Sequence, residues 1–290
     1  MRVAVIGSSG QLGTDLVKAF SSSHEVIALT HRDIEVADPG SCARLKELAP
    51  DAVINTAAFH KTDQCEDEPL KAFQVNAIGA RNVALACRDI GAIAAFISTD
   101  YVFDGKSRLP YLESDPPSPI NAYGISKLAG ELFTRQNERH YVFRVASLFG
   151  SAGASGKGGN FVEAMIAKAR KGETISVIDD IRMSPTYTRD AAAAISALIE
   201  KKAPFGTYHV TNSGECSWFE FAAAIFEALG LKVPLGAASS STYPTKARRP
   251  AYSALSSNKL GRWGIEMPRW KDALRRYLEE KGHLKPLSVA

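Results

Sequence analysis

The sequence predicts an α/β protein with a doubly wound parallel sheet and a smaller C-terminal α/β lobe. Two observations predict this class. Short apolar runs alternate with stretches of helical spacing in the first half, and the composition of the chain changes after Gly150, where a Gly/Ser/Ala stretch begins. Alternating strands and helices are typical of a parallel sheet with crossover helices on both faces. We therefore expect residues 1–150 to form one domain and residues 151–290 to form mainly a second lobe.

The expected strands of the first domain are short apolar runs. The stretches between them have helical spacing, as in 70–85, where an apolar residue recurs roughly every three to four positions. No Pro-, Gly- or Ser-rich linker divides this half. The five expected strands are residues 3–6, 25–29, 52–55, 93–98 and 141–144.

The second half begins with a Gly/Ser/Ala stretch, residues 151–159, which is too polar for a core and is expected to be a loop. Ser217 and Glu220 have the spacing of a capping box, and Gly230 ends the helix that they begin. We expect residues 185–205, which include an apolar helix, to pack back on the first domain. The expected elements are helices 160–170, 190–200, 217–229 and 269–280, and a strand at 175–178.

Composition and charge exclude several classes of protein. The chain of 290 residues is 45% hydrophobic and 23% charged, close to the globular average, so disordered and collagen-like chains are excluded. Its 35 Lys and Arg exceed its 31 Asp and Glu by four, and the basic residues are scattered. We therefore expect no nucleic-acid partner, whereas a small anionic ligand is compatible with this charge.

We expect a cytoplasmic protein that does not enter a membrane. The stretch between Asp89 and Asp100 is among the longest apolar ones, and it is about half of the ~20 residues that a membrane helix needs. The N-terminal apolar run ends after Ile6 without a cleavage-like segment. The four cysteines lack metal-like spacing and a CxxC pair, which is typical of reduced structural cysteines: Cys42, Cys65, Cys87 and Cys216.

Three glycines, Gly7, Gly10 and Gly13, follow the first expected strand, and helical spacing begins at Gln11 and Leu12. A strand, a glycine turn and a helix bring backbone N–H groups and the positive end of the helix dipole to one point, where a pyrophosphate can bind. The spacing is GxxGxxG rather than the commoner GxGxxG, and a tight turn without a ligand is the alternative. The N-terminal position in an α/β pattern favours a Rossmann-type dinucleotide site.

Residues after the second expected strand bear on the choice of cofactor. Arg32 lies where a basic group would meet a 2′-phosphate, and Asp33 could accept a hydrogen bond from a free 2′-hydroxyl. Because Arg32 is closer to the strand end, NADP(H) is favoured and NAD(H) is possible. Two solvated surface charges are the remaining alternative.

Tyr123 and Lys127 form a YxxxK pair, whose side chains share one face of a helix. An ammonium beside a phenol favours the phenolate, so the phenol can exchange a proton near neutral pH. Tyr277 and Lys281 have the same spacing, but we expect solvent around them. Thr99 ends the fourth expected strand at the sheet edge where ligands bind, and its hydroxyl could orient a substrate carbonyl.

Four blocks carry a resemblance: residues 7–13 (GSSGQLG), 55–58 (NTAA), 98–105 (STDYVFDG) and 121–131 (NAYGISKLAGE). They resemble extended short-chain dehydrogenases/reductases, and more narrowly the dTDP-4-dehydrorhamnose reductases. The resemblance continues through residues 160–161 and 179–187, so it covers most of the chain. It implies NADPH-dependent reduction of the C4 keto group of a nucleotide-linked deoxysugar, with dTDP-4-dehydro-L-rhamnose as the first candidate.

The resemblance also implies roles for individual residues. Thr99, Tyr123 and Lys127 would be the catalytic triad, and Lys127 would also hold the nicotinamide ribose. The remaining cofactor residues would be Ala57, Ala58 and Phe59 after the third strand, with Asp38 near the adenine. Substrate contacts would come from Asp100, Tyr101, Asn160 and Phe161. Without the resemblance, Asn160 as a helix cap and Phe161 as a core residue are at least as well supported.

This sequence departs from the family pattern on the substrate side. Ser147 stands where these reductases often carry a Trp that packs on the sugar, and His60 stands where Thr is common. Residues 151–159 form a longer insertion than usual. The triad is untouched, so the reaction type follows from the resemblance more firmly than the sugar does.

Two alternative functions remain. An epimerase or dehydratase of the same superfamily would retain NAD through its cycle, but such dehydratases usually follow the Thr with Asp-Glu, whereas Thr99 is followed by Asp100 and Tyr101. A regulatory protein resembling the beta subunit of methionine adenosyltransferase would not need the intact triad. We expect a monomer or homodimer. We expect no metal, because Arg189 interrupts the stretch where a bridging acid would lie.

Overall fold

The computed structural model describes residues 1–153 and 159–285, and it confirms the expected fold class. Six parallel strands form one sheet in the order β10-β5-β4-β3-β1-β2. Strand β1 lies between β2 and β3: the chain first adds β2 on one side of β1 and then adds β3 on the other side. The switch point of the sheet therefore lies between β1 and β3. The strands are β1 (Arg2–Ile6), β2 (Glu25–Leu29), β3 (Ala52–Asn55), β4 (Ile93–Thr99), β5 (His140–Val145) and β10 (Gly206–His209).

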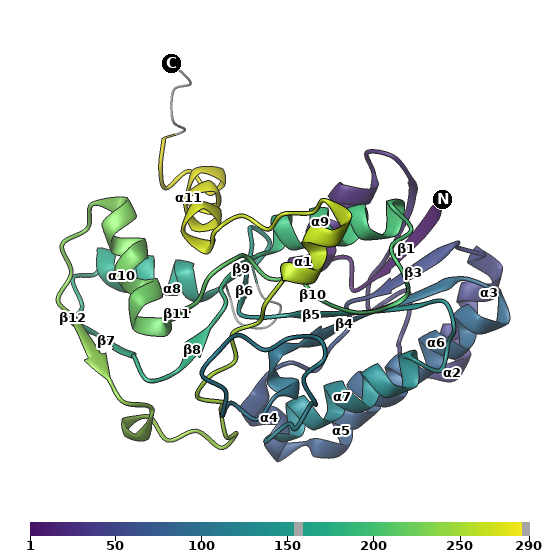
Figure 1. Cartoon of the computed structure of the whole chain (residues 1–290), viewed down its shortest axis with the longest axis horizontal. Helices are drawn as coiled ribbons and strands as arrows, with labels where there is room; N and C mark the ends of the chain where they lie inside the picture. The colour runs from purple at the N-terminus through teal and green to yellow at the C-terminus, as the bar shows by residue number, and fades with distance from the viewer. Residues whose placement is uncertain (154–158, 286–290) are drawn as a thin grey trace.

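Helices cover both faces of this sheet (Figure 1). Val3 and Val5 pack on one side with α1 (Gln11–Phe20) and α9 (Thr188–Glu200), and Ala4 and Ile6 pack on the other. Side chains alternate across a strand, so a strand buried on both faces is apolar throughout. The second face carries α2 (Pro39–Cys42), α3 (Arg44–Leu48), α4 (Thr62–Asp67), α5 (Pro69–Phe73), α6 (Gly79–Asp89) and α7 (Ala122–Thr134).

The helical region expected at 70–85 consists of three pieces. A π-helical turn at Gln74–Ile78 separates α5 from α6. Such turns occur frequently at functional sites, and this one carries the buried side chain of Asn76.

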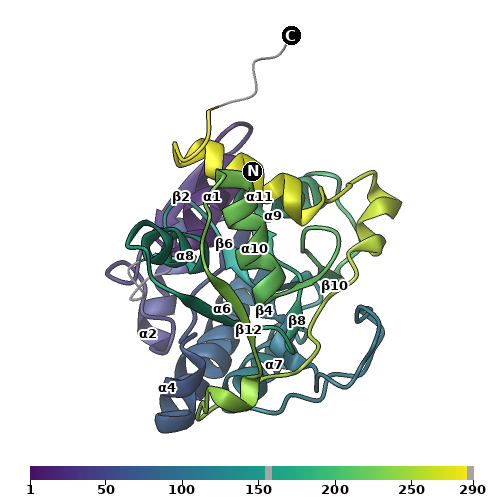
Figure 2. The same ribbon diagram turned by 90° about the vertical axis from the view of Figure 1, so that its left-hand side faces the viewer.

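The second lobe has its own aromatic core. Figure 2 shows α10 and β12 of this lobe toward the viewer. Tyr277 is fully buried there and donates to Glu163 at 2.6 Å, so the expectation that solvent surrounds it is wrong. The helices of this lobe are α8 (Phe161–Arg170), α10 (Trp218–Leu229) and α11 (Trp270–Glu280), with 3-10 turns at Ser240–Thr242 and Asn258–Trp263. A further 3-10 turn, Asp100–Val102, follows β4 in the first domain. The short strands are β6 (Leu148–Phe149), β7 (Ile175–Ile178), β8 (Arg182–Met183), β9 (Thr186–Tyr187), β11 (Cys216–Ser217) and β12 (Leu235–Ala238).

Part of the second half returns to the first sheet. Helix α9 shares the core cluster of α1, and Thr188 donates to the buried Asp15 at 2.6 Å. Strand β10 then pairs with β5, which extends the returning segment beyond the expected residue 205. The division of the chain near residue 150 remains a prediction. Residues 154–158 of the expected 151–159 loop lie outside the described residues.

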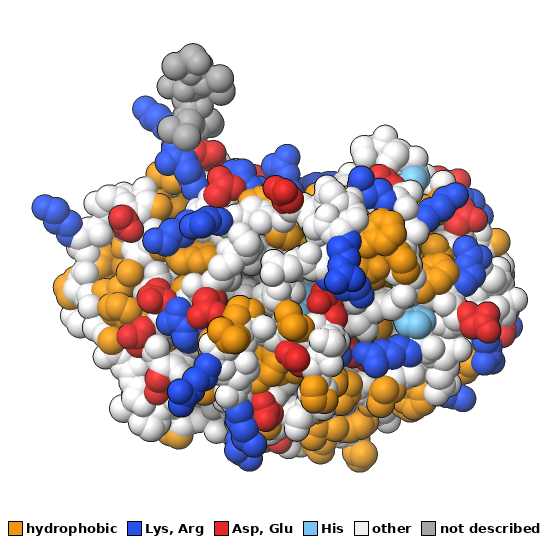
Figure 3. Space-filling view, in the orientation of Figure 1, with side chains coloured by type: hydrophobic (Ala, Val, Ile, Leu, Met, Phe, Trp, Pro, Cys, Tyr) orange, Lys and Arg blue, Asp and Glu red, His pale blue; other side chains and the backbone are white. Residues whose placement is uncertain are grey.

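Acidic and basic side chains alternate on the face shown in Figure 3. None of the helices in the described ranges is long and apolar enough to cross a membrane.

The four cysteines are buried and unbridged, and burial raises the pKa of the Cys42 thiol to about 11.

Candidate active site

The glycine turn after β1 leaves no room for side chains. A Cβ on Gly13 would lie 2.1 Å from the Gly7 carbonyl oxygen, and a Cβ on Gly7, whose φ is +78°, would lie 2.4 Å from Oγ1 of Thr56. Gly10 is the N-cap of α1 and brings no capping side chain, so the N–H groups of the first helical turn are available to an anion. The turn also lies against Ala57, at the switch point between β1 and β3.

The two residues after Gly10 contribute differently to this turn. Leu12 is 5% exposed and belongs to the core shared with α9, so only its backbone can face a ligand. Gln11 is partly buried and lies close to Gly150.

The two candidate cofactor-selecting residues, Arg32 and Asp33, have different environments in the structure. The Asp33 carboxylate accepts from the backbone N–H of Thr30 at 2.9 Å and from its hydroxyl at 2.7 Å, and it lies 3.7 Å from Arg44. These contacts hold the pKa of Asp33 below its usual value. Arg32 is exposed. Because Asp33 is already engaged, the pair favours a 2′-phosphate over a 2′-hydroxyl. Asp38 caps α2 by accepting from Gly40, a local role beside the expected adenine contact.

The loop after β3, with Ala57, Ala58 and Phe59, is held by a residue that sequence reasoning missed. Asn76 accepts from the Phe59 N–H at 2.8 Å and donates to the Phe59 carbonyl at 3.0 Å. It also donates to the Ser126 hydroxyl of α7 at 3.0 Å. The sequence gives no signal of this role, because Asn76 is one of several polar residues in the same stretch. Asn76 therefore ties the expected cofactor loop to the helix of the triad.

The structure brings Thr99, Tyr123 and Lys127 together at the carboxyl end of β4. Thr99 lies close enough to Tyr123 to lower the pKa of its phenol, against the larger effect of burial. Lys127, one helical turn after Tyr123, donates its ammonium to the Ile97 carbonyl at 2.5 Å and lies 3.9 Å from the ring centroid of Phe96. Residues from the carboxyl-terminal half of strand β4 thus contact both functional side chains of α7.

A buried network of charged side chains lies next to the triad, around Glu131 of α7. Glu131 accepts from Ser98 at 2.6 Å and from Arg144 at 2.8 Å through each of its two oxygens. The partly exposed Arg135 also pairs with Glu131 at 2.9 Å. Arg144 lies 3.4 Å from His209, and burial is the main cause that lowers the pKa of His209 to about 3. The network joins α7 to β4, β5 and β10.

The pKa of Tyr123 moves in the direction opposite to the expectation. Burial raises it, the hydrogen bond with Thr99 lowers it, and the charge of Asp100 raises it further. Lys127 does not offset the burial because its ammonium is turned to Ile97. Burial lowers the pKa of Lys127 itself to about 7, against the opposing charge of Glu131. Tyr123 is therefore held as the neutral phenol, the form that can donate a proton.

Three of the expected substrate residues lie near the triad. Asp100 accepts from the Thr99 hydroxyl at 2.9 Å, and the Tyr101 ring meets the Tyr123 ring edge to face at 6.1 Å. Ser147 follows β5 at the same sheet edge and has a φ of +43°, a backbone conformation that is unusual for a residue other than glycine.

The structure does not bring Asn160 and Phe161 to the triad. Asn160 caps α8 by accepting from Glu163, and it donates to Gly150 and to the Tyr277 hydroxyl at 3.0 Å. Phe161 stacks on Phe221 with 5.6 Å between ring centroids. These contacts are those of the helix-cap and core alternative.

A segment of the second lobe that sequence reasoning missed lies over the site. Arg249 pairs with Asp63 of α4 at 3.3 Å and hydrogen-bonds Tyr101. Asn121, the N-cap of α7, donates to the Arg248 carbonyl at 2.8 Å. The segment therefore connects the second lobe to both sides of the triad. Adjacent arginines far along the chain gave no signal of this position.

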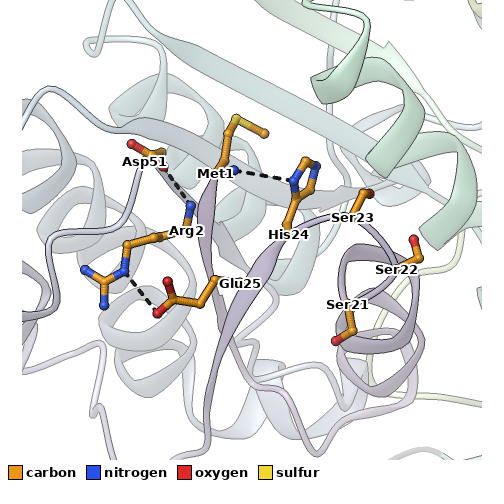
Figure 4. Close-up of a pocket in the computed structure, with 8 residues that line it drawn as sticks. All are labelled: Met1, Arg2, Ser21, Ser22, Ser23, His24, Glu25 and Asp51. Atoms are coloured by element: carbon orange, nitrogen blue, oxygen red, sulfur yellow. Dashed lines mark hydrogen bonds and ion pairs between the residues drawn. The ribbon is translucent and has the colours of Figure 1, made fainter.

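The opposite edge of the sheet carries a shallow depression, shown in Figure 4. There the backbone N–H of Arg2 donates to Asp51 at 2.7 Å, and the Arg2 side chain donates to Glu25 at 3.1 Å. The depression lies at the amino ends of β1 and β2, where ligands of open parallel sheets do not bind. Within the described residues, no group of three or more His, Cys, Asp or Glu is arranged to hold a metal.

Comparison with known proteins places this geometry among sugar-nucleotide enzymes. The family model of the RmlD substrate binding domain matches residues 1–282. The spore coat polysaccharide biosynthesis protein SpsK of Bacillus subtilis is 42% identical over 97% of this chain and 98% of its own. The structure of a dTDP-4-dehydrorhamnose reductase from Clostridium acetobutylicum has a TM-score of 0.92 and 35% identity, covering 97% of this chain and 100% of its own. That of the dTDP-4-dehydrorhamnose reductase from Bacillus anthracis, in complex with NADP, has a TM-score of 0.90 and 38% identity, covering 96% and 99%.

Proposed function

The chain belongs to the RmlD substrate binding domain family, and we propose that it reduces the C4 keto group of dTDP-4-dehydro-L-rhamnose to give dTDP-L-rhamnose. It is an NADP(H)-dependent oxidoreductase, as its relatives indicate. The observation that carries the proposal is the convergence of Thr99, Tyr123 and Lys127 at the same carboxyl edge of the sheet as the glycine turn.

The residues present fit NADP(H). The space that a Cβ on Gly7 or Gly13 would fill forms a cradle at the N-terminus of α1, and Arg32 is exposed while Asp33 is engaged by Thr30. Arg32 would hold the 2′-phosphate, and Lys127 would hold the hydroxyls of the nicotinamide ribose. When bound, NADPH supplies the hydride for the reduction.

The chain's own residues supply orientation and a proton. Thr99 donates a hydrogen bond to the substrate carbonyl oxygen, and Tyr123, held as the neutral phenol, protonates the oxygen as negative charge develops on it. General acid catalysis of this kind typically contributes about 10²–10⁴-fold in rate. Binding the ketone and the cofactor together also raises the rate, because their translational and rotational freedom is already lost before the reaction begins.

We assign the two lobes different tasks. Residues 1–150 would bind the cofactor and residues 151–290 would mainly bind the nucleotide-linked sugar, with Tyr101 and Ser147 facing it. Support comes from Arg249, which joins the second lobe to Tyr101. A cytoplasmic location and a monomeric or dimeric state remain predictions.

Two other functions are less well supported. An epimerase or dehydratase would use a retained NAD, whereas the engaged Asp33 favours a 2′-phosphate. A regulatory role like that of the methionine adenosyltransferase beta subunit would leave the hydrogen-bonded Thr99 and Tyr123 without a task.

Loss of NADPH absorbance with dTDP-4-dehydro-L-rhamnose tests the proposal, with the product identified by NMR. We expect turnover, and we expect Tyr123→Phe to reduce kcat by about 10²–10⁴-fold while the protein stays folded. Turnover that survives this substitution would contradict the mechanism. Tight NADPH binding without turnover of any 4-keto sugar nucleotide would favour the regulatory role.

A further inference from the structure

We propose that Asp63 of α4 is a positioning residue for the nucleotide-linked sugar. It fixes residues 247–249 of the second lobe, called here the attached segment, and so sets where that lobe's side of the substrate site lies relative to Tyr123. Asp63 is not among the residues expected in the site, and no step of the proposed mechanism uses it. The inference rests on the proposed reductase function and adds a residue to its substrate side.

The attachment involves three successive residues of the second lobe. The Asp63 carboxylate accepts from the backbone N–H of Ala247 at 3.0 Å through Oδ1 and from the Arg249 guanidinium at 3.3 Å through Oδ2. Between these two, the Arg248 carbonyl accepts from Asn121, the N-cap of α7, at 2.8 Å. Figure 1 shows this part of the chain running from β12 toward α4. The attached segment is therefore held from two sides, by α4 and by the start of α7.

Asp63 is itself fixed relative to the active site, because α4 is tied to two of its elements. Glu66, one helical turn after Asp63, accepts from the backbone N–H of Ala122 at 2.8 Å, where α7 begins. The Cys65 thiol donates to the Phe59 carbonyl at the end of the expected cofactor loop, with 3.4 Å between sulfur and oxygen. Helix α4 thus joins the cofactor loop to the triad helix, and the Asp63 carboxylate joins both to the attached segment.

The chain that follows the attached segment packs on the loop after β4. A Cβ on Gly105 would lie 2.6 Å from Cα of Pro250 and 2.7 Å from the backbone nitrogen of Ala251, so the two backbones are in direct contact. Tyr101, an expected sugar contact, precedes Gly105 on this loop and lies beside Arg249. A displacement of the attached segment would therefore move the residues that border the expected sugar position.

Stability alone does not explain the Asp63 contacts. The side chains of Asp63 and Arg249 are 43% and 31% exposed, and ion pairs at such positions add little to the free energy of unfolding. Ala247 is fully buried, and the carboxylate is the acceptor of its N–H. Asp63 thus supplies the placement of the attached segment before the substrate binds. If only a fraction of the molecules held this placement, the apparent affinity for the substrate would fall by that fraction.

Asp63→Ala tests this placement in the full-length enzyme. The residue is half-exposed on a six-residue helix, so we expect a folded protein with a melting temperature close to that of the wild type. We expect KM for dTDP-4-dehydro-L-rhamnose to rise at least about tenfold, as when about one tenth of the molecules hold the segment in place. The kcat should stay within about threefold, since bound substrate restores the placement. NADPH affinity should not change.

Two measurements do not depend on turnover. The affinity for dTDP-L-rhamnose in the presence of NADP⁺, measured by calorimetry, should fall by the same factor as KM rises. Trypsin cleaves after arginine but not before proline, so it can cut after Arg248 and not after Arg249. Cleavage after Arg248, followed by mass spectrometry, should be at least about tenfold faster in Asp63→Ala, because the rate follows the population of the detached segment.

Two variants serve as controls. Asp67→Ala is matched, because Asp67 lies on the same helix and pairs with the nearby Lys246 side chain but holds no backbone group of the attached segment. We expect it to leave KM and cleavage after Arg248 unchanged. Asp63→Asn keeps an oxygen that can accept from the Ala247 N–H, so it should restore most of the substrate affinity.

Each outcome decides the proposal. An unchanged KM in Asp63→Ala, an equal effect of Asp67→Ala, or a parallel loss of kcat, NADPH affinity and melting temperature would overturn it. Absence of wild-type turnover would instead refute the reductase function, and the rate of cleavage after Arg248 would still decide whether Asp63 holds the attached segment.

Discussion

Glu131 and Arg144 form a fully buried ion pair, in which N–O distances of 2.8 Å join the guanidinium to both carboxylate oxygens. Ser98 donates to the same carboxylate at 2.6 Å, so the pair holds the strand residue that precedes Thr99. A buried pair of this kind adds little net stability compared with apolar residues, but losing one partner leaves an uncompensated charge.

We expect Glu131→Ala to destabilise the protein by about 3–5 kcal/mol, because Arg144 would stay buried without its partner. The measurement is urea unfolding. Arg135→Ala is the matched control, since Arg135 pairs with the same carboxylate from a partly exposed position, and it should cost less than about 1 kcal/mol. A double variant, Glu131→Leu with Arg144→Met, should recover most of the loss. Equal losses from the two alanine variants would contradict this assignment.

The buried Lys127 should make stability depend on pH. Its folded pKa of about 7 lies below the unfolded value, so the folded state disfavours the charged form. This cost is fully present below about pH 7 and disappears as pH rises toward the unfolded value of about 10.4. We expect Lys127→Met to raise the melting temperature most at pH 6 and least near pH 10, as thermal unfolding can measure. A gain independent of pH would show that packing rather than charge causes it.

The glycine turn should tolerate no methyl group at Gly13. Its Cβ would lie 2.1 Å from the Gly7 carbonyl oxygen, so Gly13→Ala must displace the turn that faces the expected pyrophosphate. We expect NADPH affinity to fall at least about tenfold, the effect of roughly one lost charged hydrogen bond, in a fluorescence titration. Gly236→Ala is the control, because nothing lies within 4 Å of its Cβ position. Unchanged NADPH binding by Gly13→Ala would exclude this turn from the cofactor site.

Arg32 should select for the 2′-phosphate. We expect Arg32→Ala to weaken NADPH binding by about 10–100-fold, the worth of one hydrogen bond to a charged group, and to leave NADH binding nearly unchanged. Affinities for both cofactors, measured by calorimetry, give this comparison. Arg88→Ala, an exposed arginine on α6, is the control for net charge. If both cofactors weakened equally, Arg32 would not read the phosphate.

Asn76 should couple the cofactor loop to the triad helix. Asn76→Ala leaves the Phe59 N–H unpaired, at a cost of about 1–3 kcal/mol, and leaves the Phe59 carbonyl with the weak thiol donor of Cys65. Because the same side chain contacts Ser126 of α7, we also expect NADPH affinity and kcat to fall together. Asn137→Ala is the comparison, since that buried asparagine accepts only from Arg139 beyond the end of α7. Stability lost without any change in kinetics would make Asn76 a purely structural residue.

Most of the sheet could be predicted from the sequence because buried parallel strands are continuous apolar runs. Strands β2, β3 and β7 match their expected bounds, and β1, β4 and β5 extend theirs by one or two residues. Strand β10 was not predicted, since Gly206–His209 contains a single large apolar residue, Tyr208, and joins the sheet only through β5. Local periodicity carries no information about such a long-range pairing.

Some features of the candidate site could likewise be predicted from the sequence, and others could not. The GxxGxxG turn, the YxxxK pair and the strand-end Thr99 are recognisable because each requires particular residues at a fixed local spacing. Their chemistry is not local: the pKa of Tyr123 is raised because of what surrounds it. Asn160 caps α8, and its contact with the nucleotide stays a prediction.

The sequence alone therefore predicts the α/β class, the positions of the main strands along the chain and the candidate triad, since these depend on side-chain type and spacing along the chain. Only the tertiary structure decides which residues support that triad. Asn76 and Arg249 reach it from distant segments. Glu131 lies on the triad helix itself and pairs there with Arg144 of β5. Their roles arise from burial and from hydrogen bonds between segments, and these exist only when the chain is folded.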